Sequence, residues 1–122
     1  MVNQMSYLFL EYPKCSTCQK ARKWLDSQGV DYKERNIVVE NPREEELREW
    51  LQKSGYDLKK FFNTSGLLYK SMNLKERLQT MTEEEKIKLL ATNGMLVKRP
   101  IIIGENFVLT GFREEEWKKM IK

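Results

Sequence analysis

The sequence predicts an α/β fold in which one mixed β-sheet is flanked by helices and carries an inserted helical block. One observation is that an apolar strand, an amphipathic helix and a second strand follow one another near the start of the chain. A second is that helical signals then run from about residue 42 to about residue 93, before strand periodicity returns near residue 100. Two parallel strands joined through a helix, together with an antiparallel hairpin, form one mixed sheet. Because 122 residues suffice for one core but not for two, we expect residues 1–122 to form a single domain.

The first strand, helix and second strand occupy residues 7–36. Residues 7–10 are apolar and predict a strand, and residues 16–28 carry apolar side chains at helical spacing. Gly29 then supplies a residue type that commonly ends helices. A short connection follows Gly29, and the apolar run 37–39 comes soon after it, so residues 30–36 predict a second strand extended by that run.

Capping patterns mark the helices of the inserted block. Asn41 and Pro42 are typical of an N-cap and a first helical residue, and Glu44 suits a capping box. The helix that they begin carries apolar residues at helical spacing and is expected to end at Gly55. Further helical turns are predicted at residues 57–62, after Asn73 with Glu76, and after Thr82 with Glu85, the last reaching Gly94.

The end of the chain predicts a β-hairpin and a last helix. Residues 101–103 and 107–109 are apolar and flank a turn at residues 104–106. The acidic run 114–116 then begins a helix with basic residues toward its negative end, and three apolar side chains are expected to face inward. These basic and apolar sets are Lys118, Lys119 and Lys122, and Trp117, Met120 and Ile121.

The two cysteines, Cys15 and Cys18, stand where the first strand gives way to the first helix. Cys15 opens that helix, so its sulfur is expected to lie near unsatisfied backbone N–H groups and the positive end of the helix dipole, with Lys14 next to it. These groups favour the thiolate. Cys18 lies one turn further along and is expected to face inward with the apolar stripe of Ala21, Trp24 and Leu25. This arrangement suits attack by Cys15 and resolution by Cys18.

Two other interpretations of the cysteine pair are weighed against redox chemistry. A tetrahedral zinc site needs four ligands, and the chain has no histidine and no third cysteine, so it would need carboxylates or a second copy of the chain. Two buried structural cysteines without chemistry are the other alternative. A Cys-x-x-Cys between a strand and a helix favours a thioredoxin-like redox motif over both.

Composition excludes several classes of function. The lack of histidine removes nucleophiles activated by a Ser-His or Cys-His pair. The net charge of +4 comes from 22 basic and 18 acidic residues mixed along the chain, so we expect no direct binding of nucleic acid. No apolar run approaches the ~20 residues of a membrane span, and the N-terminus has no apolar segment of a signal peptide. We therefore expect a cytoplasmic protein with reduced thiols and no membrane contact.

The order of elements and a series of short motifs resemble the arsenate reductase (ArsC) and Spx family along essentially the whole chain. The resemblance implies a thioredoxin-like fold with a helical insertion, and a cis Pro100 that lies against the active cysteine. The motifs that carry it are Cys15-Ser16-Thr17-Cys18, Tyr12-Pro13-Lys14, Glu34-Arg35-Asn36, residues 61–66, and residues 93–101 with Lys98-Arg99-Pro100.

The sequence departs from both branches of that family. Arsenate reductases of this type resemble the chain at the nucleophile Cys15, but they use three arginines around arsenate and only Arg99 matches. Asn63 stands at the first arginine position, and the third falls near Gly111, two residues before Arg113. Spx proteins use the Cys-x-x-Cys as a redox switch and bind the RNA polymerase α subunit, but Ser65 stands where they have an arginine. We expect weak arsenate turnover at most, because one fixed guanidinium replaces three.

Together these observations predict a thiol-dependent oxidoreductase acting on a disulfide or an oxyanion such as arsenate. Cys15 is the expected nucleophile and Cys18 the resolving cysteine, while Arg99 stabilises negative charge. The resemblance implies substrate binding by Asn63, Thr64, Pro100 and Arg113, and electrons from thioredoxin or glutathione/glutaredoxin. We expect no bound cofactor and, from the lack of further ligand residues, no metal. The alternative is an Spx-like redox-sensing regulator that binds the RNA polymerase α subunit.

Two structural alternatives remain open at the site. Residues 63–66 could form a turn whose side chains only satisfy backbone groups, and Arg99 could be a surface ion-pair arginine. The larger aromatic residues are expected to belong to the core: Tyr7, Phe9, Trp24, Trp50, Phe61 and Phe62.

Overall fold

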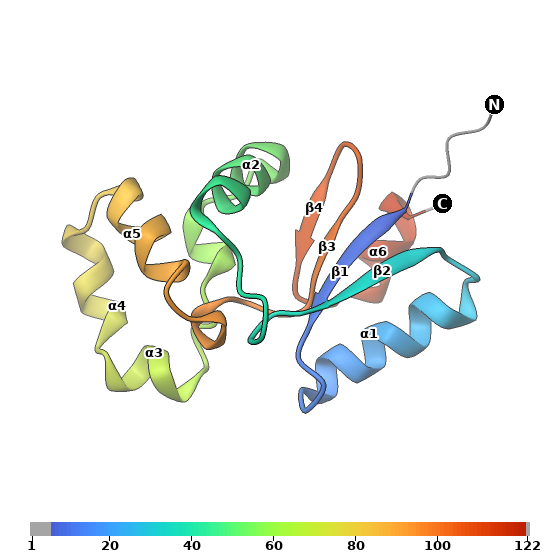
Figure 1. Ribbon diagram of the computed structural model, residues 1–122, viewed down its shortest axis with the longest axis horizontal. Coiled ribbons are helices and arrows are strands. Elements are labelled where there is room, and N and C mark those ends of the chain that lie inside the picture. The colour runs from blue at the N-terminus through green and yellow to red at the C-terminus, as the bar shows by residue number, and fades with distance from the viewer. Residues whose placement is uncertain (1–5, 122) are drawn as a thin grey trace.

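A four-stranded sheet and a group of short helices lie side by side in the computed structural model, which describes residues 6–121 (Figure 1). The strands are β1 (Tyr7–Glu11), β2 (Tyr32–Asn36), β3 (Ile101–Ile103) and β4 (Val108–Thr110), in the order β2-β1-β3-β4. β1 and β2 are parallel, and β3 is antiparallel to both β1 and β4. The mixed sheet predicted from the order of elements is therefore confirmed.

Two helices flank the sheet, and the others belong to the insertion between β2 and β3. The flanking helices are α1 (Ser16–Ser27) and α6 (Glu114–Met120). The inserted helices are α2 (Glu44–Ser54), α3 (Leu67–Ser71), α4 (Leu74–Arg77) and α5 (Glu83–Leu90), with short 3₁₀ turns η1 (Leu58–Phe61), η2 (Leu78–Thr80) and η3 (Gly94–Leu96). None of the helices within residues 6–121 combines the length and the apolar character needed to cross a membrane.

The two faces of the sheet bury different sets of side chains, as the alternation of a strand requires. Tyr7 and Phe9 of β1 pack on one face with the buried apolar residues of α1 and α6. Leu10 points to the other face, where it joins the apolar side chains of the insertion, including Trp50 and Phe61. The six aromatic residues expected in the core are all 9% exposed or less.

The apolar run 37–39 forms a turn rather than an extension of β2, so that part of the prediction is wrong. The side-chain oxygen of Asn36 accepts hydrogen bonds from the N–H groups of Val38 (2.9 Å) and Val39 (3.1 Å), which closes the chain on itself. Ile37 is fully buried, whereas Val39 is 77% exposed. The turn therefore places one apolar side chain of the three in the core.

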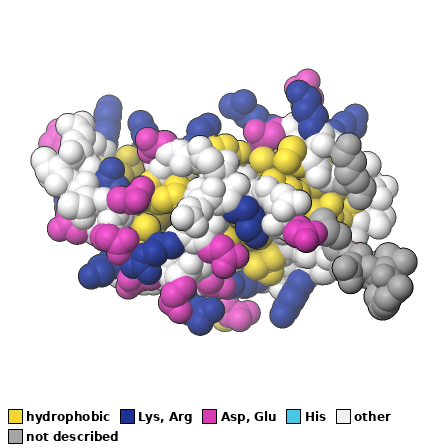
Figure 2. All heavy atoms as spheres, turned by 90° about the horizontal axis from the view of Figure 1, so that it is seen from above, with side chains coloured by type: hydrophobic (Ala, Val, Ile, Leu, Met, Phe, Trp, Pro, Cys, Tyr) yellow, Lys and Arg dark blue, Asp and Glu magenta, His cyan; other side chains and the backbone are white. Residues whose placement is uncertain are grey.

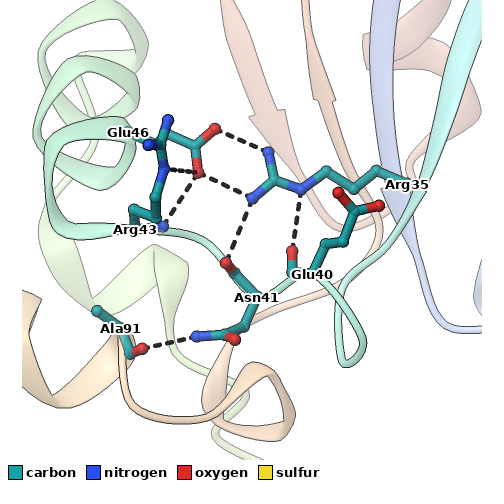
Figure 3. Close-up of polar contacts among 6 residues, drawn as sticks. All are labelled: Arg35, Glu40, Asn41, Arg43, Glu46 and Ala91. Atoms are coloured by element: carbon teal, nitrogen blue, oxygen red, sulfur yellow. Dashed lines mark hydrogen bonds and ion pairs between the residues drawn. The ribbon is translucent and has the colours of Figure 1, made fainter.

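Helix α2 begins at Glu44, two residues later than Asn41 and Pro42 predict. Arg43 is the N-cap, and its backbone N–H donates to the Glu46 carboxylate at 3.0 Å. Asn41 is not the cap because its side-chain amide donates instead to the backbone carbonyl of Ala91 at 2.6 Å (Figure 3). The expected end of the helix is confirmed, since Gly55 adopts the left-handed conformation with φ 71°.

Arg35 joins the end of β2 to the start of α2 (Figure 3). Its two terminal nitrogens lie 2.7 and 2.8 Å from the two carboxylate oxygens of Glu46, and its Nε donates to the carbonyl of Glu40 at 2.9 Å. These hydrogen bonds from Arg35 lower the pKa of Glu46 to about 2. A bidentate pair of this kind fixes orientation as well as distance, so it holds the insertion against the sheet.

Capping in the rest of the insertion follows the prediction in one case and differs in another. Thr82 and Glu85 form the expected reciprocal capping box at the start of α5, with hydrogen bonds of 3.1 and 2.8 Å. Asn73 has a left-handed backbone, with φ 54°, and its amide donates to Glu76 at 3.4 Å rather than accepting from the helix. It marks the helix start without acting as a side-chain cap.

The last helix buries Trp117 and Ile121 as expected, but Met120 is 40% exposed and does not face inward. Ile121 reaches the core because the chain leaves the helix there in an extended conformation. Phe112 takes part in this packing instead, with its ring centre 4.9 Å from that of Trp117. Lys122 lies outside the described residues.

Candidate active site around Cys15

Cys15 is the N-cap of α1 and is half-buried at the end of the turn that follows β1. Its backbone N–H donates to the carbonyl of Tyr12 at 2.9 Å, and its carbonyl accepts from the N–H of Gln19 at 3.1 Å. The Gln19 side chain in turn donates to the carbonyl of Pro13 at 2.9 Å. The turn is thus tied to the first turn of the helix, which fixes the position of the Cys15 sulfur.

The surroundings of Cys15 lower the pKa of its thiol. Burial by itself raises that pKa, but the backbone N–H and the thiol of Cys18, the positive charge of Arg99 and the backbone N–H of Thr17 outweigh it. These are the helix N–H groups expected from the sequence. The cation among these causes is Arg99, whereas Lys14, which is exposed, is not one of them.

Cys18 has the opposite environment. It is fully buried, and the backbone N–H of Tyr12 donates to its sulfur at 3.5 Å. Burial is the main cause that raises the pKa of Cys18 to about 12, with smaller contributions from Cys15 and Glu11. The expected difference in exposure and acidity between the two thiols is therefore present, and both thiols are free.

Arg99 lies beside this pair and precedes a cis peptide bond to Pro100, as the family resemblance implied. Its guanidinium lies over the ring of Tyr12, with 5.2 Å from Cζ to the ring centre. The Nε and Nη1 atoms are buried and have no hydrogen-bond partner within residues 6–121. The interpretation of Arg99 as a surface ion-pair arginine is therefore wrong, since it forms no ion pair with the residues described.

A cleft of about 1200 Å³ opens at Cys15 and extends along the insertion. Among the residues predicted for the site, Cys15, Asn63, Thr64, Arg99 and Arg113 line it together. Cys18 and Pro100 do not line it, and both are buried. The start of α1 and helix α3 lie toward the same lower edge of the molecule in Figure 1.

The loop 63–66 forms one wall of the cleft. The backbone N–H of Asn63 donates to the carbonyl of Leu96 at 2.8 Å, and the N–H of Gly66 donates to the carbonyl of Asn63 at 3.1 Å. A Cβ atom at Gly66 would lie 2.6 Å from the Asn63 amide nitrogen, so glycine leaves room for this side chain. The loop is a tight turn, and it also borders the cleft with Cys15.

Sequence reasoning missed three lysines that line the same cleft and an acid near the cysteine pair. Lys98 was part of the motif Lys98-Arg99-Pro100 but had no role assigned to it, and Lys59 and Lys60 have no spacing that would have linked them to Cys15. Glu11 could have been found, because strand alternation places it on the same face as Phe9. It is 2% exposed, and its Oε1 lies 2.7 Å from Nη2 of Arg22 as an ion pair rather than a directed hydrogen bond.

Burial and the nearby Glu34 carboxylate raise the pKa of Glu11 to about 7, despite the opposing charge of Arg22. Arg22 also pairs with Glu34 at 2.6 Å and therefore serves two carboxylates. Glu11 immediately precedes Tyr12, whose backbone N–H donates to the Cys18 sulfur, and the charge of Glu11 contributes to the raised pKa of Cys18.

Residues 10–120 match the ArsC family. The chain belongs to this family. The thioredoxin-like fold and the Cys-x-x-Cys at the first strand-to-helix junction agree with that assignment. The match extends over both the sheet and the helical insertion.

Similar proteins include a transcriptional regulator and a solved structure of the same family. The chain is 49% identical to the uncharacterized protein YusI of Bacillus subtilis (strain 168), over 94% of this chain and 98% of that protein. It is 30% identical to the global transcriptional regulator Spx of Listeria innocua, over 89% of this chain and 82% of Spx. The crystal structure of an ArsC family related protein from Bacteroides fragilis has a TM-score of 0.93 and 58% identity, covering 97% of this chain and 99% of that one.

Proposed function

We propose that this protein is a thiol-dependent oxidoreductase in which Cys15 attacks a disulfide and Cys18 resolves the intermediate. One observation carries the proposal: a half-buried thiol of lowered pKa and a fully buried thiol of raised pKa share the first turn of one helix. The thiolate is the nucleophile in thiol–disulfide exchange, so Cys15 is prepared to attack and Cys18 is protected until it is needed.

The reaction takes place in two exchange steps. The Cys15 thiolate attacks one sulfur of the substrate disulfide, which forms a mixed disulfide and releases the other sulfur as a thiolate. Cys18 then loses its proton and attacks the Cys15 sulfur, which releases the second substrate thiolate and leaves a Cys15–Cys18 disulfide. The substrate gains two electrons and the protein loses two.

The other predicted site residues act on charge and position. Arg99 offers unpartnered nitrogens beside Cys15, which suits stabilisation of the attacking and leaving thiolates. Asn63, Thr64 and Arg113 line the cleft and are assigned to substrate binding. Pro100 is buried next to Arg99, so its part is to position the segment that carries this arginine.

A dithiol or two monothiols must return the two electrons to the Cys15–Cys18 disulfide. We assign this part to thioredoxin or to glutathione with glutaredoxin, in the cytoplasm, where such systems keep thiols reduced.

Arsenate is assigned as a poor substrate. The cleft has Arg99 beside Cys15, while Asn63 and Gly111 offer no guanidinium at the other two arginine positions. A doubly charged tetrahedral anion needs several charge-assisted donors, whereas disulfide exchange needs a thiolate and access to it.

Steady-state turnover tests this proposal. We would measure reduction of arsenate and of a small synthetic disulfide, each with thioredoxin and with glutaredoxin as reductant. We expect turnover of the disulfide that is abolished in Cys15→Ser, and little turnover of arsenate. Absence of disulfide turnover with either reductant, or arsenate rates in the ordinary range of ~1–10³ s⁻¹, would contradict the proposal.

Redox-sensing regulation is the second candidate, and it is supported by the relatives. Besides Spx, the chain is 29% identical to the regulatory protein MgsR of Bacillus subtilis, over 93% of this chain. In this function the Cys15–Cys18 disulfide changes a surface that binds the RNA polymerase α subunit, and nothing is turned over. Capture of the α subunit by only one redox state, without turnover of any disulfide, would favour the regulator.

A further inference from the structure

The cleft that opens at Cys15 carries an excess of positive charge. Five basic side chains line it, namely Lys59, Lys60, Lys98, Arg99 and Arg113, against the single carboxylate of Asp57. This excess equals the formal net charge of the whole chain, which is +4. Elsewhere acids and bases balance, and Figure 2 shows one face on which the two kinds are interspersed.

The charges in the cleft are not neutralised by the protein itself. Within residues 6–121, the ion pairs involve Arg22, Arg35, Arg43, Arg48 and Lys53, and none involves the five cleft cations. The Asp57 carboxylate accepts a hydrogen bond from the backbone N–H of Lys59 at 2.9 Å and caps η1. The ammonium of Lys60 lies 5.7 Å from the ring centre of Tyr56 and forms no ion pair with an acid among residues 6–121.

The size and the apolar lining of the cleft favour a polypeptide over a small anion. Its volume of about 1200 Å³ exceeds the ~300–1,000 Å³ of pockets for small ligands. Leu67 lines it and is 85% exposed, and Phe112 and Met95 add further apolar surface. Such a groove accepts a chain segment with both acidic and apolar side chains.

We propose that this cleft binds an acidic segment of a partner protein, with the disulfide that Cys15 attacks inside that segment. This inference rests on the proposed function and names its class of substrate. Arg99 and the adjacent Lys98, which line the cleft with Cys15, are assigned to the part of the segment that carries the attacked disulfide. Lys59 and Lys60 of η1 bind acidic side chains further along the segment. Electrostatic contacts of this kind select the partner and speed its association.

The test uses three short peptides of one cysteine each, with acidic, neutral or basic flanks, joined to a thiopyridyl group. Attack by Cys15 releases neutral pyridine-2-thione, and Cys18 then releases the peptide thiol, so one turnover consumes no other reductant. Each single-turnover rate is divided by the rate with dithiothreitol, which removes differences in the intrinsic reactivity of the disulfides.

We expect the acidic peptide to react on the order of tenfold faster than the basic one at low salt, and the preference to fade as the Debye length falls to ~3 Å at 1 M salt. The double variant Lys59→Glu with Lys60→Glu should lose or reverse the preference, as should the milder Lys59→Gln with Lys60→Gln. The matched control, Lys118→Glu with Lys119→Glu, changes two adjacent exposed lysines of α6 and should keep it.

The outcomes separate this inference from the proposed function. Equal rates for all three peptides, or equal effects of the η1 and α6 variants, would overturn the acidic-segment assignment while leaving the exchange chemistry intact. Oxidised glutathione reacting faster than the acidic peptide would reassign the cleft to a small anionic disulfide and also overturn it. No reaction with any disulfide would instead contradict the proposed function.

Discussion

Replacing Glu11 with glutamine should change how the free energy of unfolding depends on pH. Glu11 is 2% exposed, and burial first, with the neighbouring Glu34, raises its pKa from 4.5 to about 7. Between these values the folded protein binds more protons than the unfolded chain, so the free energy of unfolding falls as pH rises. Above pH ~7 this loss is complete.

The pKa shift fixes the size of the effect. One pKa unit corresponds to about 1.36 kcal/mol, so ionising Glu11 in the folded protein costs about 3 kcal/mol relative to ionising it in the unfolded chain. Glutamine resembles the protonated side chain and does not titrate. The stability of Glu11→Gln relative to the unaltered protein should therefore rise by about 2–3 kcal/mol between about pH 4.5 and about pH 8.

Urea unfolding of the reduced protein at a series of pH values measures this difference. Glu34→Gln is the matched control, because Glu34 shares Arg22 with Glu11 but its side chain is 41% exposed. The difference in stability between Glu34→Gln and the unaltered protein should change less with pH. This variant removes only one of the causes that raise the pKa of Glu11 and leaves its burial, which is the main one. Parallel pH profiles for Glu11→Gln and the unaltered protein would refute the reasoning.

Three further predictions concern the thiols, the insertion and the substrate. The rate of alkylation measured against pH should show that the pKa of Cys15 lies below its ordinary value. Arg99→Met should raise the pKa of Cys15, because it removes one of the causes that lower it. Faster alkylation of Cys18 than of Cys15 would contradict the assignment. Glu46→Gln should lower the free energy of unfolding by about 2 kcal/mol at neutral pH. This difference should shrink as pH falls from about 4.5 toward about 2, where Glu46 itself becomes protonated. Urea unfolding at both ends of this pH range measures the difference, and a difference independent of pH would count against the ion pair. Asn63→Arg should tighten arsenate binding by supplying a second guanidinium in the cleft, measured by calorimetry against Asn63→Gln, and equal affinities of the two variants would show that this position does not face the anion.

Local patterns in the sequence were enough to place the sheet, the first helix and the cysteine pair. Helical spacing put Cys18 with Ala21 and Leu25, and all three are fully buried. The position of Cys15 at the helix start followed from the same pattern and is confirmed by its role as N-cap. The assignment of residues 1–122 to one domain stays a prediction, as do the chemical roles of the site residues.

What the sequence did not reveal depends on contacts between distant segments. Asn41 has the composition of an N-cap, but its bond to Ala91, fifty residues away, moves the helix start to Glu44. Likewise, Lys59 and Arg113 line one cleft only because the insertion folds back beside the sheet. No local sequence pattern predicts that these residues lie close together, so the positive charge of the cleft could be recognised only from the folded structure.

The most direct test of the central claim is to locate the covalent adduct formed during disulfide exchange. The variant Cys18→Ser and the unaltered protein would each be mixed with one equivalent of a small disulfide, quenched in acid and mapped by mass spectrometry. We predict a stable mixed disulfide on Cys15 in the variant, and a Cys15–Cys18 disulfide with no adduct in the unaltered protein. An adduct on Cys18 in the unaltered protein, or one that persists on Cys15 while Cys18 stays reduced, would contradict the division of roles between the two thiols.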